Sequence, residues 1–125
     1  MPSSTVSRRL LLDHNLPRPM ARMLNQFNAC TTADEGWSTL VNGKLLEAAE
    51  REGFDVFLSG DQNLRHQQRV TGRSLAIVVL SSNAWPVIQQ SPAPIIQAVA
   101  DAAPGSYTEV ALPRPPLNRR PAPER

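Results

Sequence analysis

Short apolar runs alternate with amphipathic segments along most of this chain. Four runs are too short for helices and rich in strand-forming residues, which predicts strands at residues 9–12, 29–33, 56–58 and 75–80. The last run, LAIVVL, has no polar residue, a pattern typical of a strand buried on both faces. Residues 107–112 predict a further strand at an edge of the sheet.

Helical periodicity fills the gaps between these strands. Apolar residues spaced three and four apart predict a helix at 16–27 and another between Asn42, as its cap, and Gly53. We also expect a polar helix at 63–70 and a last helix at 92–103. The side chains expected to face the core are Leu16, Met20, Met23, Leu24, Phe27, Leu45, Leu46, Ala49, Ile95, Ile96, Val99 and Ala103. Such alternation predicts an α/β fold with a parallel sheet of four to five strands and helices on both faces.

Composition divides the chain into three parts. Its 125 residues suit one domain, and 41% of them are hydrophobic, but five of its 12 prolines cluster after Pro104. We therefore expect a flexible leader at 1–8, a folded domain at 9–112 and a disordered tail rich in proline and arginine at 113–125.

Charge, cysteine content and the absence of long apolar stretches bear on where the protein works and what it binds. A net charge of +2 excludes a polycation that coats nucleic acid, so charge has to be judged locally. Cys30 is the only cysteine and cannot form an internal disulfide, and residues 1–9 lack the apolar centre of a signal peptide. No stretch approaches the ~18 apolar residues of a membrane span. These features predict a cytoplasmic protein without a membrane partner.

Two acidic residues, Asp13 and Asp61, stand just past the carboxyl ends of predicted strands. If the strands are neighbours, the carboxylates converge, and two like charges are costly unless a cation lies between them. Mg²⁺ and Mn²⁺ prefer oxygen ligands. Asn15, Asp34 and Asn63 would add further oxygen ligands to those of the two aspartates. A divalent metal so placed can polarise a phosphoryl oxygen and activate a water.

Ordinary turn chemistry offers an alternative for the same residues. An aspartate after a strand is a common turn residue and helix cap. Asn15 and Asn63 are equally suited to capping helices, and Asp34 to a solvated loop. His14 and His66 have no partner at metal-ligand spacing.

Basic residues follow the same edge of the predicted sheet. Arg18, Arg22, Arg65, Arg69 and Arg73 lie on segments at or close to it, where they would guide a phosphate backbone toward the acids. Solvated helix faces give the same spacing, so both interpretations stay open. The sequence has no glycine-rich dinucleotide loop, phosphate-binding GKS or GKT, Cys/His zinc pattern or nucleophile elbow.

Three stretches, LLDHNLPRPMARML, DEGWSTLVNGKLLEAAEREGFDVFLSGDQNLRHQQ and LAIVVL, resemble PIN-like domains. The resemblance runs from about Arg9 to Leu112 and is to a small bacterial PIN-like family similar to the VapC-type toxins of toxin–antitoxin pairs. It implies a Rossmann-like, three-layer sheet and a metal-dependent ribonuclease site. Asp13 and Asp61 match the catalytic, metal-binding acids, Asn15 accompanies the first, and Asp34 falls near an acid of this subfamily.

The chain departs from the family pattern at two places. Related domains have an acid at the start of the middle helix, where this chain has Asn42, Gly43 and Lys44. In the family's T-x-D-x-D-F pattern, here SGDQNL, Asn63 replaces the second aspartate. Fewer carboxylates attract a cation less strongly, so we expect one weakly held Mg²⁺ or Mn²⁺, with Lys44 in contact with phosphate.

Two functions follow from these observations. The first is a metal-dependent endoribonuclease, the toxin of a toxin–antitoxin pair, with Asp13 and Asp61 as catalytic residues. Its partners would be RNA, contacted by Arg18, Arg22, Lys44, Arg65 and Arg69, an antitoxin protein and, through the 92–103 helix, a second copy in a homodimer. The alternative is a non-catalytic binding module that has lost part of the acidic site and acts through a protein or RNA partner.

Overall fold

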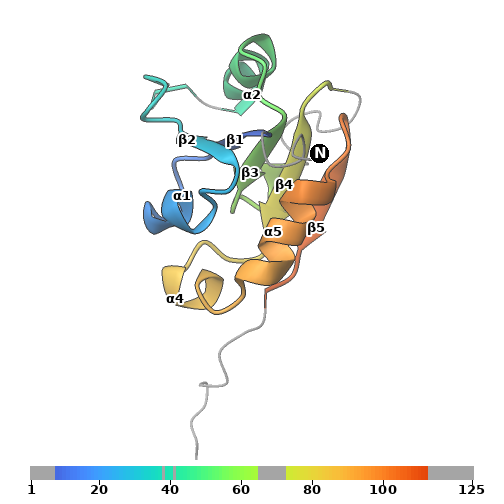
Figure 1. Cartoon of the computed structure of the whole chain (residues 1–125). Helices are drawn as coiled ribbons and strands as arrows, with labels where there is room; N and C mark the ends of the chain where they lie inside the picture. The colour runs from blue at the N-terminus through green and yellow to red at the C-terminus, as the bar shows by residue number, and fades with distance from the viewer. Residues whose placement is uncertain (1–7, 38, 41, 65–72, 113–125) are drawn as a thin grey trace, which may run out of the picture.

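Five parallel strands form a single sheet at the centre of the protein (Figure 1). The computed structural model describes residues 8–37, 39–40, 42–64 and 73–112. Along the sheet the strand order is β2-β1-β3-β4-β5, and every neighbouring pair is parallel. The strands are β1 (Arg9–Leu12), β2 (Asn28–Thr31), β3 (Val56–Ser59), β4 (Ala76–Leu80) and β5 (Tyr107–Val110). The predicted parallel sheet is confirmed, with five strands in the described residues.

Helices cover both faces of this sheet (Figure 1). In the described residues they are α1 (Pro19–Met23), α2 (Asn42–Arg51), α4 (Trp85–Ile88) and α5 (Pro92–Asp101). Met20, Ile88 and Ile95 of α1, α4 and α5 share one hydrophobic cluster, whereas Leu45 and Leu46 of α2 belong to the other. The protein is therefore a three-layer, Rossmann-like α/β fold, as predicted.

The strands supply side chains to both clusters in alternation. Leu10 and Leu12 of β1 face the α1–α5 side, and Leu11 faces α2. All five residues of β4 are buried, which confirms that its unbroken apolar run reflects burial on both faces.

The first predicted helix, 16–27, is wrong in length but right in its buried face. Only Pro19–Met23 is helical, although Leu16, Met20, Leu24 and Phe27 are all buried as expected. Pro19 has no N–H, which suits the first turn, and the N–H of Phe27 bonds to the carbonyl of Leu24, three residues back rather than four. The spacing of apolar residues reports which side chains face the core, and a series of tight turns satisfies it as well as a helix does.

The carboxyl-terminal part differs from the prediction in detail. α5 ends at Asp101, and the backbone of Ala102 is extended, so that Ala102 is buried and Ala103, the predicted core residue, is exposed. Helix α4 was not predicted, since its four residues are too few to show a helical period. The predicted helix at 63–70 lies outside the described residues beyond Leu64, as do leader residues 1–7 and the tail.

Candidate functional site

The strand order reverses direction between β1 and β3. From β1 the chain moves to β2 on one side and then crosses to β3 on the other side of β1. In doubly wound sheets the loops diverge at such a point, and the crevice at the carboxyl ends of the strands is where ligands bind. β1 and β3 pair with Leu12 beside Leu58, and the N–H of Asp13 donates to the carbonyl of Leu58 at 2.9 Å. The strands that precede Asp13 and Asp61 are therefore neighbours, which is the arrangement that convergence of the two acids requires.

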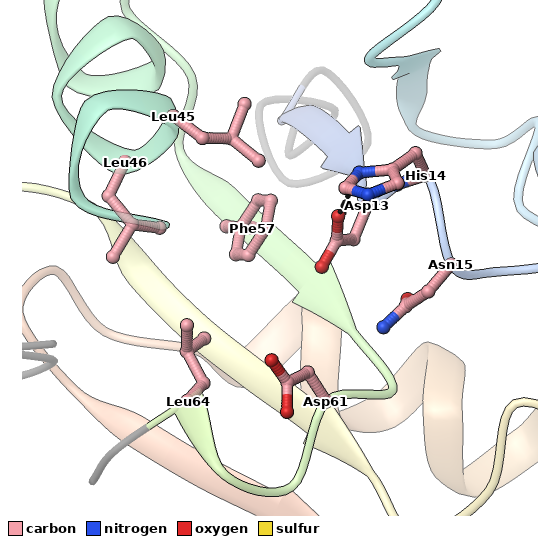
Figure 2. Close-up of a pocket in the computed structure, with 8 residues that line it drawn as sticks. All are labelled: Asp13, His14, Asn15, Leu45, Leu46, Phe57, Asp61 and Leu64. Carbon is pink, nitrogen blue, oxygen red and sulfur yellow. Dashed lines mark hydrogen bonds and ion pairs between the residues drawn. The ribbon is translucent and has the colours of Figure 1, made fainter. Parts of the chain in front are cut away.

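A small cavity opens at this point (Figure 2). It encloses about 80 Å³ and is lined by Asp13, His14, Asn15, Leu45, Leu46, Phe57, Asp61 and Leu64. The side chains of Asp13, Asn15 and Asp61 extend toward the same space, and leucines of α2 with Phe57 form its apolar wall (Figure 2). One water needs roughly 10–15 Å³ by this measure, so the cavity has room for a few waters or a partly hydrated ion. It is too small for a nucleotide, since organic ligands occupy pockets of roughly 300 Å³ or more.

Asp13 is held rigidly at the rim of this cavity. The residue is only 8% exposed. Its Oδ1 accepts the backbone N–H of His14 at 2.7 Å and lies 2.9 Å from the Nδ1 of the same residue. Its Oδ2 accepts the hydroxyl of Ser59 at 2.7 Å. Oδ2, with Ser59 as its one partner in the described residues, keeps a further lone pair, so these bonds orient the group without removing its capacity to bind a cation.

Ser59 is a site residue that the sequence analysis did not identify. Its side chain is fully buried, donates to Asp13, and accepts the backbone N–H of Asp61 at 3.0 Å. One hydroxyl therefore couples the two acidic residues. The available signal was a polar residue at the end of an otherwise apolar, buried strand, because buried hydroxyls need partners.

Asp61 has one carboxylate oxygen in use and one uncommitted. Oδ1 accepts the N–H of Asn63 at 3.0 Å, which closes a turn. Oδ2 forms no hydrogen bond or ion pair with the residues that the structure describes, and the carboxylate extends toward the cavity (Figure 2). The side chain of Asn63 is exposed and does not line the cavity.

Asn15 connects its own loop, after β1, to the loops that contain Gly60 and Asn83. Its Oδ1 accepts the N–H of Gly60 at 3.4 Å, and its carbonyl accepts the side-chain amide of Asn83 at 3.3 Å. A Cβ at Gly60 would lie 2.9 Å from the Cβ of Asn83 and 3.3 Å from Leu16, so only glycine fits there. Asn15 does not cap α1, whose N-cap is Arg18, and its side chain lines the cavity.

Two other predicted residues lie away from this space. Asp34 accepts the N–H of Thr31 at 3.0 Å, and its own N–H donates to the Thr31 hydroxyl at 3.1 Å, so it closes the turn after β2. Lys44 is exposed, and α2 presents Leu45 and Leu46 to the cavity instead. The side chain of Asn42 lies outside the described residues.

The predicted basic residues divide into three groups. Arg18 and Arg22 are exposed at the start and on the surface of α1. Arg65 and Arg69 lie outside the described residues. The placement of Arg73 near the acids is wrong, because it precedes β4 and therefore stands at the amino edge of the sheet, where it pairs with Glu50 at 2.7 Å.

The donor set suits one weakly held hard cation. Two carboxylates face one small space, and Mg²⁺ is usually bound by one or two carboxylates with water in the remaining positions. Among the described residues, no group of three or more histidines, cysteines and acids is placed to hold a metal, so a closed protein cage is absent from that part. The residues fit Mg²⁺ or Mn²⁺ held largely by water.

Thiol chemistry does not extend this site. Burial, followed by the carboxylates of Glu35 and Asp34, raises the pKa of the Cys30 thiol above its ordinary value of 9.0. The thiol is therefore protonated at neutral pH, and the reactive thiolate is scarce.

Comparison of the chain with protein-family models, curated proteins and solved structures finds no match. Within the described ranges, no helix has the length and apolar character needed to cross a membrane.

Proposed function

We propose that this protein is a Mg²⁺- or Mn²⁺-dependent endoribonuclease of the PIN-like type and the toxin of a bacterial toxin–antitoxin pair. The observation that carries the proposal is the position of Asp13 and Asp61 together at the switch point of the sheet, coupled by the hydroxyl of Ser59. Two carboxylates around one cavity repel each other, and a bound cation relieves that repulsion.

The residues around the cavity would have different roles in metal binding. Asp13, fixed by two hydrogen bonds, gives a preorganised anionic oxygen, and Asp61 offers an oxygen that has no other partner among the described residues. When bound, a divalent ion stabilises negative charge on a phosphoryl oxygen and makes water a better nucleophile. Leu45, Leu46 and Phe57 exclude solvent from one side of the cavity, which strengthens attraction between carboxylate and cation.

Substrate would lie outside the cavity rather than within it. The enclosed space admits a phosphate oxygen and waters but no base or sugar. Exposed Arg18 and Arg22 on the neighbouring α1 are available to backbone phosphates, and such contacts bind without reading sequence.

A second candidate is a non-catalytic module that binds RNA or a protein. It is favoured by the composition of α2, which presents leucines and no carboxylate to the cavity. The position of Asp34 in a separate turn leaves only two acids at the cavity among the described residues.

A calorimetric titration with Mn²⁺ tests the proposal directly. The natural chain is expected to bind about one ion weakly, and Asp13→Asn with Asp61→Asn should abolish the binding heat while keeping the side-chain volumes. Cleavage of mixed RNA should stop with a chelator, return with Mn²⁺, and fall about a hundredfold or more in the double variant, since even supporting residues of metal sites cost about 10–100-fold.

Asp34→Asn is the matched control, because it removes a carboxylate that lies outside the cavity. It should leave both metal binding and cleavage close to those of the natural chain. If the natural chain neither binds Mn²⁺ at millimolar concentration nor cleaves RNA, the nuclease proposal fails and the binding module remains.

A further inference from the structure

Residues of α1 and α4 line a second concave surface, on the face of the sheet opposite α2. Figure 1 shows the two helices. This α1–α4 groove has a volume of about 350 Å³ and is lined by Pro19, Arg22, Met23, Trp85, Gln89 and Pro92. Its size is within the range of pockets that take organic ligands, roughly 300–1,000 Å³. Asn83, two residues before Trp85, contacts Asn15 and Gly60. The groove is therefore linked across the carboxyl edge of the sheet to the loops that carry the acids.

The two chain segments that line the groove carry positive charge and no acidic residue. Residues 14–33, which include α1, and residues 62–100, which include α4, contain no aspartate or glutamate. The guanidinium groups of Arg18 and Arg22 form no hydrogen bond or ion pair within the described part of the chain. Although the molecule as a whole is nearly neutral, this side of it is suited to an anion.

Trp85 gives the groove an aromatic surface. The residue is half-buried, packs against the hydrophobic cluster that contains Met20, Ile88 and Ile95, and has no aromatic partner among the described residues. Gln89 follows four positions later, just past α4, so its exposed amide lies on the same side. An aromatic ring, a guanidinium and an amide in one groove are the groups that stack a base, bind the neighbouring phosphate and bond the edge of the base.

We propose that the α1–α4 groove binds a nucleobase of single-stranded RNA. The base stacks on Trp85, Arg22 binds an adjacent phosphate, and Gln89 contacts the edge of the base. This inference rests on the proposed action on RNA and adds a substrate subsite to it. A peptide is the other occupant that an apolar groove admits, but the guanidinium and the lack of acids favour a polyanion.

Fluorescence of Trp85 tests the proposal. In a Trp37→Phe chain, Trp85 is the remaining tryptophan, and titration with a short single-stranded RNA of mixed sequence in EDTA should quench its emission to saturation. Arg22→Glu should raise the dissociation constant about tenfold or more, because it replaces a phosphate contact with repulsion. Arg51→Glu is the matched control, since Arg51 is exposed in the last turn of α2, away from the groove, and should change the constant little.

Equal weakening by Arg22→Glu and Arg51→Glu, or RNA binding without a change in Trp85 emission, would overturn the subsite. If Trp37→Phe does not fold, anisotropy of labelled RNA with the two arginine variants in the natural chain decides the same question. The Asp13→Asn, Asp61→Asn variant should keep the quenching and lose cleavage. Quenching by a natural chain that cleaves no RNA would end the nuclease proposal alone, and cleavage without quenching would end the subsite alone.

Discussion

A single buried hydroxyl organises the candidate site. Ser59 uses its donor for Asp13 and one acceptor position for the Asp61 backbone, so both of its hydrogen-bonding roles are filled. A hydroxyl with these partners is inexpensive to bury, whereas the groups it serves become unsatisfied if it is removed. The residue therefore links the stability of β3 to the geometry of the acids.

Ser59→Ala is expected to lower the free energy of unfolding by about 1–3 kcal/mol, because it leaves a buried carboxylate oxygen and a backbone N–H without a partner. It should also weaken Mn²⁺ binding, since Asp13 loses its orientation. Urea unfolding and metal titration measure the two effects. Ser106→Ala removes a hydroxyl whose partner among the described residues is the nearby Ala103 carbonyl in a turn, so it should cost less. Equal losses would argue against a special role for Ser59.

Residue positions at strand ends could be predicted, but positions in loops could not. Apolar runs predict the two strands that precede Asp13 and Asp61, and the convergence of these acids follows from the pairing of β1 with β3 in the structure. Asp34 is placed by a turn with Thr31 that depends on backbone direction after β2. Arg73 was misplaced because a residue before a strand lies at the opposite edge from a residue after it.

At the scale of elements, an ion pair joins the end of α2 to the start of β4. The Oε1 of Glu50 accepts a hydrogen bond from the guanidinium of Arg73 at 2.7 Å, and its Oε2 accepts one from the backbone N–H of Ser74 at 2.9 Å. Burial alone would raise the pKa of Glu50, but the Ser74 N–H and the charge and hydrogen bond of Arg73 together hold this pKa below its ordinary value of 4.5. The lowered pKa means that ionised Glu50 stabilises the folded state.

Glu50→Gln should therefore lower the free energy of unfolding by about 1–2 kcal/mol at pH 7, where the natural carboxylate is ionised. The contribution is present above the unfolded pKa near 4.5 and is lost as pH falls through the lower folded pKa. Urea unfolding at pH 7 and again below pH 4 should show the gap between the two chains closing. A gap that is independent of pH would contradict the assigned role.

Element type was more predictable than element length. The unbroken run of β4 and the strong amphipathic pattern of α2 left little choice of structure. α1 is shorter than its apolar spacing suggests, since successive turns bury the same side chains without a continuous helix. α4 has too few residues to show any period, so only the fold around it determines its shape.

At the scale of the whole molecule, the sheet separates two apolar clusters. Ile77 belongs to the cluster under α2, and Ile95 and Val99 of α5 belong to the cluster on the opposite face. The alternation of strands and helices predicted this layered plan. The order of strands in the sheet could not be predicted from the sequence, because an apolar run does not specify which strand it will pair with.

Substitutions on the two faces should act independently. Ile77→Val and Ile95→Val should each cost about 0.5–1.5 kcal/mol, and the double variant should equal the sum within about 0.5 kcal/mol. Thermal or urea unfolding of the single and double variants measures this. For comparison, Ile95→Val is combined with Val99→Ala, one turn away on α5, and this pair is expected to depart from the sum of its single effects. A similar departure for the pair across the sheet would show that the two faces are coupled.

Because β1 pairs with β3, the candidate site can form only after both strands have been synthesised. Asp13 and the serine that orients it are 46 positions apart in the chain, with β2 and α2 between them. At ribosomal rates of about 5–20 residues per second, the second half of the candidate site follows the first by several seconds. During that interval β1 has one edge without its permanent neighbour, and no complete pair of acids exists. Under the proposed nuclease function, a growing chain is thus expected to be inactive until β3 takes its place in the sheet.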